Sequence, residues 1–382
     1  MTKHSTIAID YTPAYEQGGG IGRLVRDLVA ALARYDTETA YRLFVSGVSQ
    51  STLPLSLAPN FSWKLTRISP KWLARIWQRA RLPLPVELFV GQVDLYHATD
   101  FVLPPTRSAT RTVVTVHDLS FVRVPDAASP RLKAYLDVVV PRSIRLADHV
   151  IADSQATKID LMDLYATPLE KITVLLSGVD SRYNNVLGVP SMTIRNKYNI
   201  PETPYLFTIG TVQPRKNYSR VIRALKILRE RGYDLCLVIA GGKGWLENEM
   251  VQTIEATGMS DYVNLIGFVD EEDLPVLYQG AECVAFPSLY EGFGFPVLEG
   301  MACGTPVITS NISSLPEVAG DAALLVNPLD VEEIAHAIQR ILDDSQLKAT
   351  LIQRGLEQVK HFTWEKSAKQ LKQIYTHVLA TT

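Results

Sequence analysis

Two glutamates, Glu291 and Glu299, stand eight residues apart in the segment Glu-Gly-Phe-Gly-Phe-Pro-Val-Leu-Glu. Pro296 suits the first position of a helix, because its fixed φ is helical and its missing N–H would be unpaired there anyway. We therefore expect Glu291 on a loop and Glu299 in the first or second helical turn, both facing one cleft. Free N–H groups at a helix start bind anions, and carboxylates accept hydrogen bonds from hydroxyls. The segment suits a sugar nucleotide, although an isolated pair is more simply explained as a capped helix start.

Two adjacent cations, Arg215 and Lys216, lie in a second loop, Gly210–Asn217. The apolar run 205–209 before it has strand character, and 218–229 after it has helical periodicity. Ligands of open α/β sheets bind at such strand-to-helix loops. Arg can grip phosphate oxygens with two N–H groups, and Lys adds a point charge. The loop therefore predicts a grip for a diphosphate, with an ordinary solvated loop as the alternative.

Several short motifs resemble the GT-B retaining glycosyltransferases of family 4, and they follow that family's order along nearly the whole chain. Besides the two loops, with Pro-Arg-Lys-Asn at 214–217, they are Gly-Gly-Gly-Ile-Gly-Arg (18–23), Val-His-Asp (116–118), Ser-Gly-Val-Asp (177–180) and Phe-Thr-Trp (362–364). The Pro-Arg-Lys-Asn version is similar to mannosyltransferase-like enzymes of polysaccharide and glycolipid assembly. The resemblance implies a retaining hexosyltransferase that uses a nucleotide diphosphate sugar of the GDP-mannose or UDP-glucose type. Its acceptor would be a saccharide or a lipid-linked saccharide.

The resemblance also implies donor contacts, residue by residue. Glu291 would bind hydroxyls of the transferred sugar, Glu299 would bind the ribose, and the two loop cations would neutralise the diphosphate leaving group. Backbone N–H groups that serve the sugar and the phosphate would come from Gly292, Phe293, Gly294, Phe295, Val297 and Leu298. Many relatives carry an Arg directly after the glycine that ends the strand, where this chain has Thr211. Arg215 is therefore expected to supply that charge.

A glycine-rich turn at 18–22 follows the first apolar strand, where it would let the backbone approach a ligand closely. Its spacing is not that of a dinucleotide-binding fingerprint. The resemblance places Gly20 and Gly22 near the donor phosphates. It also implies that His117, at a strand end, is a catalytic residue, as are Glu291, Arg215 and Lys216. A structural histidine is the alternative for His117. The residues expected on the acceptor side are Arg23, His97, Asp100 and Asp118.

The expected reaction needs neither metal nor cofactor. No Asp-x-Asp metal site stands out, and two cations with a helix N-terminus can stabilise a departing diphosphate. The resemblance implies a front-face mechanism, in which the leaving phosphate helps to deprotonate the acceptor. Because Lys216 lies in a loop, we expect it to contribute little to the fold. Two other functions would use similar features: a sugar-nucleotide epimerase of the same fold, and a two-domain sugar-binding protein without catalysis.

The composition, with 47% hydrophobic and 20% charged residues, is typical of a soluble globular protein. A chain of 382 residues is too long for one ordinary core, so two domains are expected. No apolar run is long enough to span a bilayer, and the start Met1–Ser5 leads into a strand, unlike a signal peptide. Cys236, Cys283 and Cys303 lie in apolar contexts and indicate free thiols in a reducing cytosol. We expect a cytoplasmic protein without a nucleic-acid partner.

A basic segment distinguishes the first half of the chain. Residues 1–182 carry 21 Lys and Arg against 17 Asp and Glu, a net charge of +4, and the remainder carries −6. No acidic residue occurs between Thr39 and Val86, and Lys71–Arg81 has the pattern of a short basic amphipathic helix. With three tryptophans in its neighbourhood, the segment 63–81 could lie on an anionic membrane surface. An ordinary surface helix with snorkelling Arg stems is the alternative.

Strand-like and helix-like segments alternate through both halves, which predicts an α/β protein with two doubly wound, Rossmann-like domains and a cleft between them. We assign residues 1–182 to an acceptor-side domain, 183–202 to a linker and 203–362 to a nucleotide-sugar domain. The resemblance implies that a last helix, 363–382, packs back on the first domain. The expected strands are 6–10, 42–45, 95–98, 112–116, 150–153, 172–176, 206–209, 236–240, 263–267, 283–287, 306–309 and 323–326, and a helix is expected at 21–34.

Overall fold

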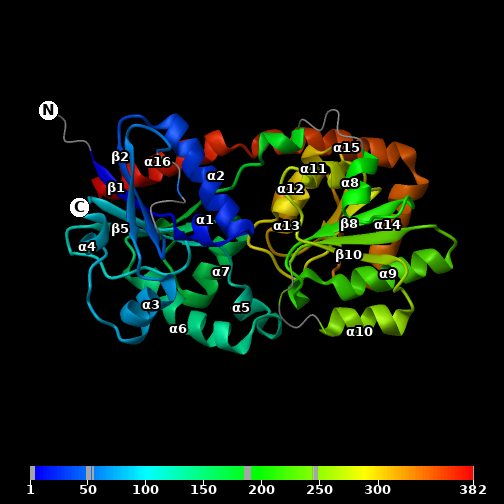
Figure 1. The fold of residues 1–382 in the computed structure, drawn as a ribbon, viewed down its shortest axis with the longest axis horizontal. Helices are drawn as coiled ribbons and strands as arrows, with labels where there is room; N and C mark the ends of the chain where they lie inside the picture. The colour runs from blue at the N-terminus through cyan, green and yellow to red at the C-terminus, as the bar shows by residue number, and fades with distance from the viewer. Residues whose placement is uncertain are drawn as a thin grey trace. The chain divides into compact units, whose positions relative to one another are not determined.

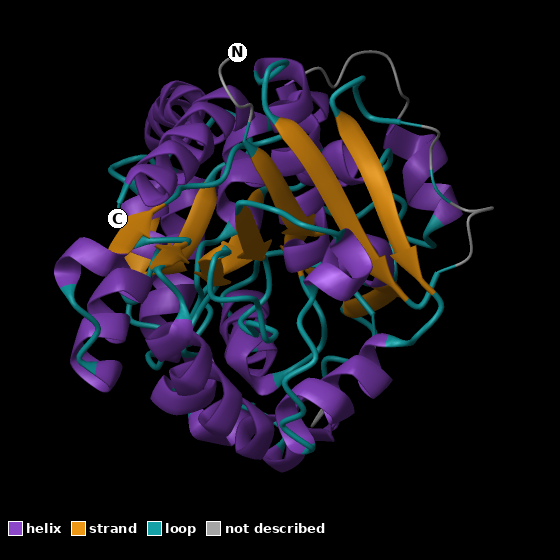
Figure 2. Cartoon of the chain, turned by 90° about the vertical axis from the view of Figure 1, so that its left-hand side faces the viewer, coloured by secondary structure: helices purple, strands orange, loops and turns teal. Residues whose placement is uncertain are grey.

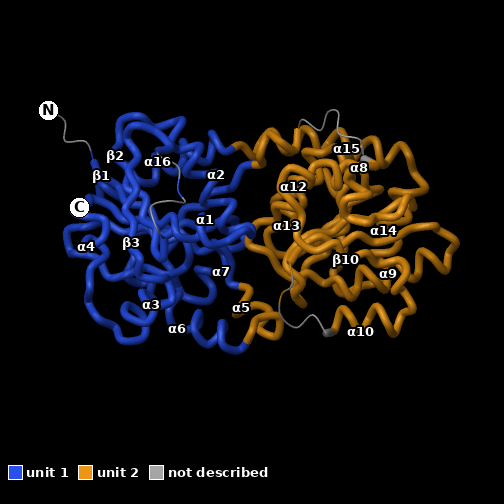
Figure 3. The backbone as a smooth tube through the Cα atoms, viewed as in Figure 1, with its two compact units in different colours: residues 1–119, 130–178, 364–382 blue, residues 120–129, 179–363 orange. Residues whose placement is uncertain are grey.

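The computed structural model describes residues 5–48, 53, 56–184, 191–242, 244 and 248–381 (Figure 1). The chain forms two compact units (Figure 3). Unit 1 contains residues 1–119, 130–178 and 364–382, and unit 2 contains residues 120–129 and 179–363. Residues 185–190 of the expected linker and Met1–His4 of the expected start lie outside the described residues.

The sheet of unit 1 has seven parallel strands in the order β3-β2-β1-β4-β5-β6-β7. β1 pairs with both β2 and β4, so that Ile9 stands opposite Leu43 on one side and His97 on the other. Parallel strands covered by helices on both faces are apolar nearly throughout, and Figure 2 shows helices on both sides of the strands. The strands are β1 (Thr6–Asp10), β2 (Ala40–Ser46), β3 (Phe61–Thr66), β4 (Leu95–Ala98), β5 (Arg111–Val116), β6 (His149–Ala152) and β7 (Ile172–Val174).

The helices of unit 1 cover both faces of this sheet and include the last helix of the chain. α2 buries the apolar stripe that its sequence predicts, with Leu24, Leu28 and Leu32 inside. The helices are α1 (Thr12–Glu16), α2 (Gly20–Tyr35), α3 (Pro70–Ala74), α4 (Glu87–Val90), α6 (Pro130–Leu146), α7 (Gln155–Tyr165) and α16 (Trp364–Ala380).

α16 packs on unit 1, as the resemblance implies. Ser367 and Gln370 donate to carbonyl oxygens at and just after β7, and Lys372 forms an ion pair of 3.1 Å with the buried Asp36. Tyr375 reaches the core, where its hydroxyl lies 2.7 Å from His97 Nδ1. The end of the chain is therefore part of the first unit.

Unit 2 has a six-stranded parallel sheet in the order β10-β9-β8-β11-β12-β13. The strands are β8 (Tyr205–Ile209), β9 (Cys236–Ala240), β10 (Val263–Gly267), β11 (Cys283–Phe286), β12 (Val307–Ser310) and β13 (Leu324–Val326). The helices are α5 (Ser120–Arg123), α8 (Ser191–Lys197), α9 (Tyr218–Glu230), α10 (Asn248–Thr257), α11 (Leu274–Gln279), α12 (Phe295–Ala302), α13 (Leu315–Ala319), α14 (Val331–Asp343) and α15 (Ser345–Gln358). The three cysteines are buried free thiols. Two Rossmann-like parallel sheets confirm the predicted fold class.

The structure corrects the sequence analysis at two places in unit 1. β3 was not expected, because this edge strand is mostly half-buried and lacks a continuous apolar run. The single helix predicted at Lys71–Arg81 is instead the short α3 followed by a π-helical turn, Arg75–Arg79, in which Ala80 N–H donates to the Arg75 carbonyl. Within this turn two consecutive side chains, Trp77 and Gln78, are buried. Among the described helices, none is long and apolar enough to cross a membrane.

Candidate functional site

The order of strands in unit 2 reverses between β8 and β11, and ligands of open α/β sheets bind outside the carboxyl ends of strands at such a switch point. The loop after β8 is Gly210–Asn217, and the loop after β11 runs from Pro287 to Gly294. The two loops are joined directly, since Leu289 N–H donates to the Arg215 carbonyl over 2.8 Å. The strand order therefore brings the two predicted donor loops together.

Two glycines, Gly210 and Gly241, allow close backbone packing at this site. Gly210 has φ of +145°, and a Cβ there would lie 2.9 Å from Lys216 Cε. Gly241, after β9, has φ of +140°, and a Cβ would lie 2.1 Å from the Gly210 carbonyl oxygen. Neither position accommodates a side chain. The backbone segments that follow β8 and β9 can therefore approach each other closely where the loop Gly210–Asn217 begins.

Arg215, Lys216 and Glu291 form one ionic cluster. Arg215 Nη1 lies 2.6 Å from Glu291 Oε2 and also donates to the Tyr290 carbonyl over 2.8 Å. Lys216 Nζ lies 2.7 Å from Glu291 Oε1 and 4.8 Å from the centre of the Phe286 ring. All three side chains are largely buried. The side chain of Lys216 is buried beside Phe286, so the premise that a loop cation buries little is wrong, and its small contribution to the fold stays a prediction.

Electrostatics keep Glu291 ionised. Burial opposes its charge, but the charges of Arg215 and Lys216 outweigh this effect and hold the pKa of Glu291 below its usual value. One carboxylate with two cations leaves the cluster with a net positive charge. The net positive charge can therefore attract a further anion, which would compete with Glu291 for the two cations.

The loop that carries Glu291 is fixed by two serines and leads into α12. Glu291 N–H donates to Ser313 Oγ, and Ser314 Oγ donates to the carbonyls of Glu291 and Phe293. Gly294 has φ of +127° and precedes α12, whose second residue is Pro296, one position later than expected. Of the other predicted backbone contacts, Gly292 and Phe293 lie in the loop, Phe295 begins α12, and Val297 and Leu298 are buried in it.

Glu299 lies in the second turn of α12 and is 1% exposed. Its Oε2 accepts a hydrogen bond of 2.6 Å from the hydroxyl of Tyr278, in α11. Only a small surface of Glu299 is therefore open to a ribose in this structure, and its contact with the donor stays a prediction.

A cavity of about 540 Å³ adjoins the cation loop in unit 2. Pro214 and Leu289, from the two switch-point loops, line it together with Glu249 and Arg123–Ala127. Its volume lies in the range of roughly 300–1,000 Å³ that is usual for ligand pockets. The sequence analysis did not single out Arg123 or its neighbours.

The glycine-rich turn lies in unit 1 at the start of α2. A Cβ on Gly22 would lie 1.9 Å from the Gln17 carbonyl oxygen, so the close packing of the turn on α2 requires glycine there. Gly20 is the first residue of α2, and Arg23 is half-buried in the first turn. The packing of Gly22 explains this glycine without a ligand, and the predicted phosphate contacts stay predictions.

His117 follows β5 and is buried between two hydrogen-bond acceptors. Its Nδ1 lies 2.8 Å from Asp153 Oδ2, and its Nε2 lies 2.8 Å from the Thr99 carbonyl oxygen. Because a carboxylate and a carbonyl only accept hydrogen bonds, both ring nitrogens must donate, and the imidazole is charged. Burial opposes the charge, but Asp153 raises the pKa of His117 to about 9. His117 thus holds Thr99, the residue before Asp100, and its predicted contact with the donor stays a prediction.

The other residues expected on the acceptor side that lie near these strand ends are His97, Asp100 and Asp118, and their environments differ from that of His117. His97 is buried, and its two nitrogens lie 2.7 Å from the Tyr375 hydroxyl and 2.8 Å from Thr115 Oγ1. Burial lowers the pKa of His97 to about 3, so the ring is neutral, which is typical of a structural histidine. Asp100 is half-buried and accepts a hydrogen bond of 3.1 Å from Gln17 Nε2, and Asp118 is half-buried just after His117.

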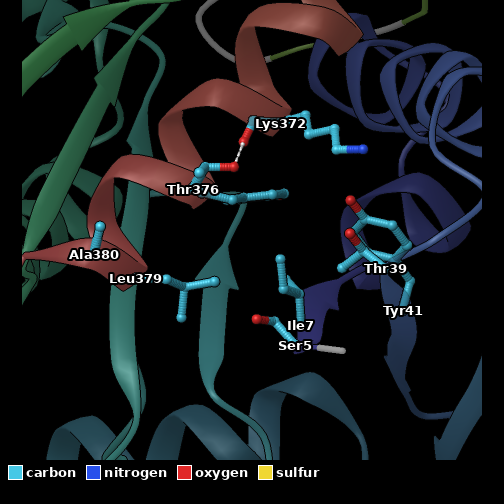
Figure 4. A pocket seen from close by; sticks show the side chains of 9 residues that line it. Ser5, Ile7, Thr39, Tyr41, Lys372, Thr376, Leu379 and Ala380 are labelled. Atoms are coloured by element: carbon cyan, nitrogen blue, oxygen red, sulfur yellow. Dashed lines mark hydrogen bonds between the residues drawn. The ribbon is translucent and has the colours of Figure 1, made fainter. Parts of the chain in front are cut away.

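A cavity of about 310 Å³ lies at the opposite, amino ends of β1 and β2, against α16, and Figure 4 shows the side chains that line it. Among the described residues that line it, Lys372 is the charged one, and it pairs with Asp36. Thr376 Oγ1 donates to the Lys372 carbonyl along the helix. Because this cavity lies away from the carboxyl ends of the strands, we assign it no part in ligand chemistry.

The sequence analysis assigned no role to several residues that build these sites. Asn217 has φ of +63°, and its Nδ2 donates to the carbonyls of Pro287 and Pro328. An Asn directly before a helix was a usable signal, because Asn tolerates this backbone conformation. Tyr278, Ser313 and Asp153 carry no such local signal, since their partners are distant in sequence.

Two family models match the chain: "Glycosyltransferase Family 4" at residues 18–183 and "Glycosyl transferases group 1" at residues 191–358. An O-antigen chain mannosyltransferase B from Escherichia coli is 34% identical over 283 residues, which is 74% of each chain. A D-inositol 3-phosphate glycosyltransferase from Salinispora arenicola is 29% identical over 98% of this chain and 92% of its own. The sucrose-phosphate synthase structure from Thermosynechococcus elongatus superposes with a TM-score of 0.76 at 23% identity, over 99% of this chain and all of that one.

Proposed function

The chain belongs to glycosyltransferase family 4, with a group 1 glycosyl transferase domain in its second half, and on this premise we propose that it is a retaining hexosyltransferase. Its donor is a nucleotide diphosphate sugar of the GDP-mannose or UDP-glucose type. Its acceptor is a saccharide or a lipid-linked saccharide in polysaccharide or glycolipid assembly. The similarity to an O-antigen chain mannosyltransferase supports a mannosyl donor.

The observation that carries the proposal is the cluster of Arg215, Lys216 and Glu291 at the switch point of unit 2. Its net positive charge suits a diphosphate, and its carboxylate suits sugar hydroxyls. The N-terminus of α12 adds N–H groups and positive potential at the same place. A nucleotide sugar presents both chemical groups to one site.

In the proposed reaction the bond between the anomeric carbon and the diphosphate oxygen breaks while the acceptor oxygen attacks from the same face. Arg215 and Lys216 stabilise the negative charge that grows on the leaving diphosphate. An oxygen of that diphosphate takes the proton of the acceptor hydroxyl, so that the configuration at the anomeric carbon is retained. Glu291 holds hydroxyls of the transferred sugar in position.

We propose further that no metal ion is needed, because two cations and a helix N-terminus supply the positive charge. Transfer in the presence of excess chelator tests this point. Unchanged turnover is expected, and loss of turnover that is restored by Mg²⁺ or Mn²⁺ contradicts it.

The basic segment 63–81 is proposed to dock the enzyme on an anionic membrane surface on the cytoplasmic side. Trp72 is 57% exposed, with the Arg75 guanidinium 4.8 Å above its ring. Leu73 and Trp77 are buried and anchor the segment in unit 1. Other exposed residues of the segment include Arg67, Ile68, Lys71, Arg75, Arg79 and Arg81.

A screen of nucleotide sugars tests the proposed function. A ligand that binds only the folded protein raises its melting temperature, so the true donor is expected to stabilise the chain and to be hydrolysed slowly without acceptor. Transfer to a saccharide primer should then retain the anomeric configuration, as seen by NMR of the product. Conversion of the donor into an epimer, or tight binding of a free sugar without any nucleotide, would overturn the proposal.

A further inference from the structure

The loop that carries Glu291 also carries a buried hydroxyl that forms no hydrogen bond. Ser288 is the second residue after β11 and precedes Glu291 by three positions. Its side chain is 0% exposed, and its Oγ has no hydrogen-bond partner in the described part of the chain. A buried hydroxyl is normally paired, because leaving it unpaired costs free energy. An unpaired hydroxyl inside the proposed donor site therefore points to a bond that forms in another state of the site.

The backbone around Ser288 is fixed on three sides. Asn217 Nδ2 donates to the carbonyl of the preceding residue over 2.8 Å, and the N–H of the following residue donates to the Arg215 carbonyl over 2.8 Å. The carbonyl of Ser288 itself accepts a hydrogen bond of 2.5 Å from Ser310 Oγ, at the end of β12. The loop 210–217 and β12 thus hold this serine in place, although its own hydroxyl contributes no hydrogen bond.

Ser288 lies close to the carboxylate of Glu291. Burial opposes the charge of Glu291, the charges of Arg215 and Lys216 outweigh it, and the Ser288 hydroxyl also lowers the pKa of this carboxyl. Its distance or angle to the carboxylate is nevertheless not that of a hydrogen bond. Both carboxylate oxygens are already engaged, Oε2 by Arg215 and Oε1 by Lys216. Ser288 and Glu291 are therefore neighbours that form no hydrogen bond in this state.

The other groups that face Glu291 use their hydrogens. Arg215 and Lys216 donate to the carboxylate itself. Tyr218, at the start of α9, is affected by the charge of Glu291, but its hydroxyl donates to a carbonyl oxygen of the preceding loop over 2.9 Å. Among these described neighbours, Ser288 is the one whose hydroxyl hydrogen is not used.

A bound diphosphate would change the environment of Glu291. It competes with the carboxylate for Arg215 and Lys216, which are the partners that keep the carboxylate charged. The backbone of Glu291 is fixed, since its N–H donates to Ser313 Oγ and its carbonyl accepts from Ser314 Oγ. A buried carboxylate that has lost its hydrogen bonds is costly. A replacement donor must therefore lie within reach of the side chain, as the Ser288 hydroxyl does.

We propose that Ser288 is a positioning residue that takes over one carboxylate oxygen of Glu291 when a diphosphate occupies Arg215 and Lys216. The proposal rests on the proposed function, because it describes the donor-bound state of the same site. The Ser288 hydroxyl then donates to one oxygen of Glu291 and leaves the other oxygen for a hydroxyl of the transferred sugar. Ser288 acts on the sugar through Glu291 and not by direct contact.

The test uses the full chain, with GDP and UDP as probes in calorimetric titrations. Ser288→Ala is expected to weaken binding of the nucleotide that the wild type binds by about tenfold, because Glu291 then lacks a donor when the diphosphate takes the cations. The melting temperature of the ligand-free variant should stay the same or rise, since the removed hydroxyl was unpaired. A serine with a purely structural role gives the opposite result. An unchanged affinity, or a lower melting temperature without ligand, would overturn the proposal.

A double-mutant cycle with Glu291→Ala isolates the pair. Without the carboxylate, the Ser288 hydroxyl has nothing to hold, so adding Ser288→Ala to Glu291→Ala should leave the affinity for the nucleotide unchanged. A tenfold loss in both backgrounds would show that the hydroxyl acts on another group and would overturn the proposal.

Thr208→Val is the matched control. Thr208 is also 0% exposed and has no hydrogen-bond partner among the described residues, but it lies within β8 and not on the loop of Glu291. The control should leave the affinity for the nucleotide unchanged. An equal loss for Thr208→Val and Ser288→Ala would mean that any buried hydroxyl of unit 2 has this effect, and the proposal would fail.

The dependence of the affinity on pH gives a further result that a structural serine would not change. Ser288 serves the ionised form of Glu291, so protonation of Glu291 removes the advantage of the wild type. The ratio of the wild-type affinity to that of Ser288→Ala should therefore narrow between about pH 8 and pH 5. A ratio that stays constant over this range would contradict the assigned partner.

Binding of the probes to the wild type separates this inference from the proposed function. If the wild type binds GDP or UDP and Ser288→Ala binds it equally well, this inference fails and the proposed function stands. If the wild type binds neither nucleotide and hydrolyses no nucleotide sugar, the proposed function fails, and this inference fails with it.

Discussion

Lys216 Nζ and Glu291 Oε1 lie 2.7 Å apart, although the two residues are 75 positions apart in the chain. Without a ligand, the cation expected at the diphosphate is neutralised by the carboxylate expected at the sugar. A bound diphosphate would compete with Glu291 for Lys216 and Arg215. Recognition of the phosphates and recognition of the sugar are therefore coupled through one carboxylate.

Lys216→Ala is expected to lower turnover by about a hundredfold or more, because it removes a charge that meets the departing diphosphate. It should also lower the melting temperature, since Lys216 is buried and its loss leaves Glu291 with one partner fewer. Single-turnover rates with saturating donor and thermal unfolding check the two effects. Lys226→Ala, which removes a half-buried lysine on α9 that pairs with Glu230, is the control and should change neither. Near-normal turnover of Lys216→Ala would refute its assigned role.

Glu299→Gln and Glu291→Gln should separate recognition of the nucleotide from recognition of the transferred sugar. If Glu299 binds the ribose, its substitution leaves a ribose hydroxyl poorly paired and weakens binding of the nucleoside diphosphate by about 1–3 kcal/mol. Glu291→Gln should bind the same nucleotide at least as tightly as the wild type, because it releases Arg215 and Lys216, yet it should transfer sugar slowly. Calorimetric affinities for the nucleoside diphosphate decide the matter, and an equal loss in both variants contradicts this division of roles.

The pair of His117 and Asp153 should make stability depend on pH. The pKa of His117 is raised in the folded state from 6.5 to about 9, so its stabilising contribution is fully present below pH 6.5 and is lost as pH rises through 9. The contribution is on the order of 1–3 kcal/mol. We expect the melting temperature of the wild type, measured relative to that of His117→Gln, to fall by several degrees between pH 6.5 and 9.

His97→Gln is the matched control for this measurement. His97 is equally buried, but burial lowers its pKa to about 3, so it does not titrate between pH 6.5 and 9. The melting temperature of His97→Gln should change with pH between 6.5 and 9 as that of the wild type does. A parallel pH profile for His117→Gln and the wild type would show that His117 is neutral in the folded protein.

Docking on membranes should depend on charge. The protein is expected to sediment with vesicles that contain anionic lipid and to be released by salt, because the exposed cations of 63–81 are screened at high ionic strength. Arg75→Glu with Arg79→Glu should abolish sedimentation without lowering the melting temperature, since both side chains are exposed.

The control for docking reverses two exposed cations elsewhere on unit 1, Arg131 and Lys369, to Glu and should leave sedimentation unchanged. Equal binding to neutral vesicles, or no binding to either kind, would restore the interpretation of 63–81 as an ordinary surface segment.

The sequence by itself determined which segments become buried strands and which loops carry charge. Strands such as 95–98 and 236–240 were predicted with their bounds, because buried parallel strands are continuous apolar runs. β3 escaped prediction because an edge strand needs only partial burial, and the π-helical turn escaped because the local sequence does not show that both Trp77 and Gln78 are buried in unit 1. Each loop motif consists of a few consecutive residues, so its position could be predicted from the sequence.

Only the tertiary structure decided which side chains meet. The order of strands places β1 beside β4 and β8 beside β11, and this order alone joins Asp10 to Thr99 and Lys216 to Glu291. It also gives His117 two acceptors and His97 two hydroxyl neighbours, so that two similar histidines carry opposite charge states. Residue type and local spacing carry no record of these contacts, because the partners are separated by 18 to 278 positions and are brought together by the pairing of strands and the packing of α16.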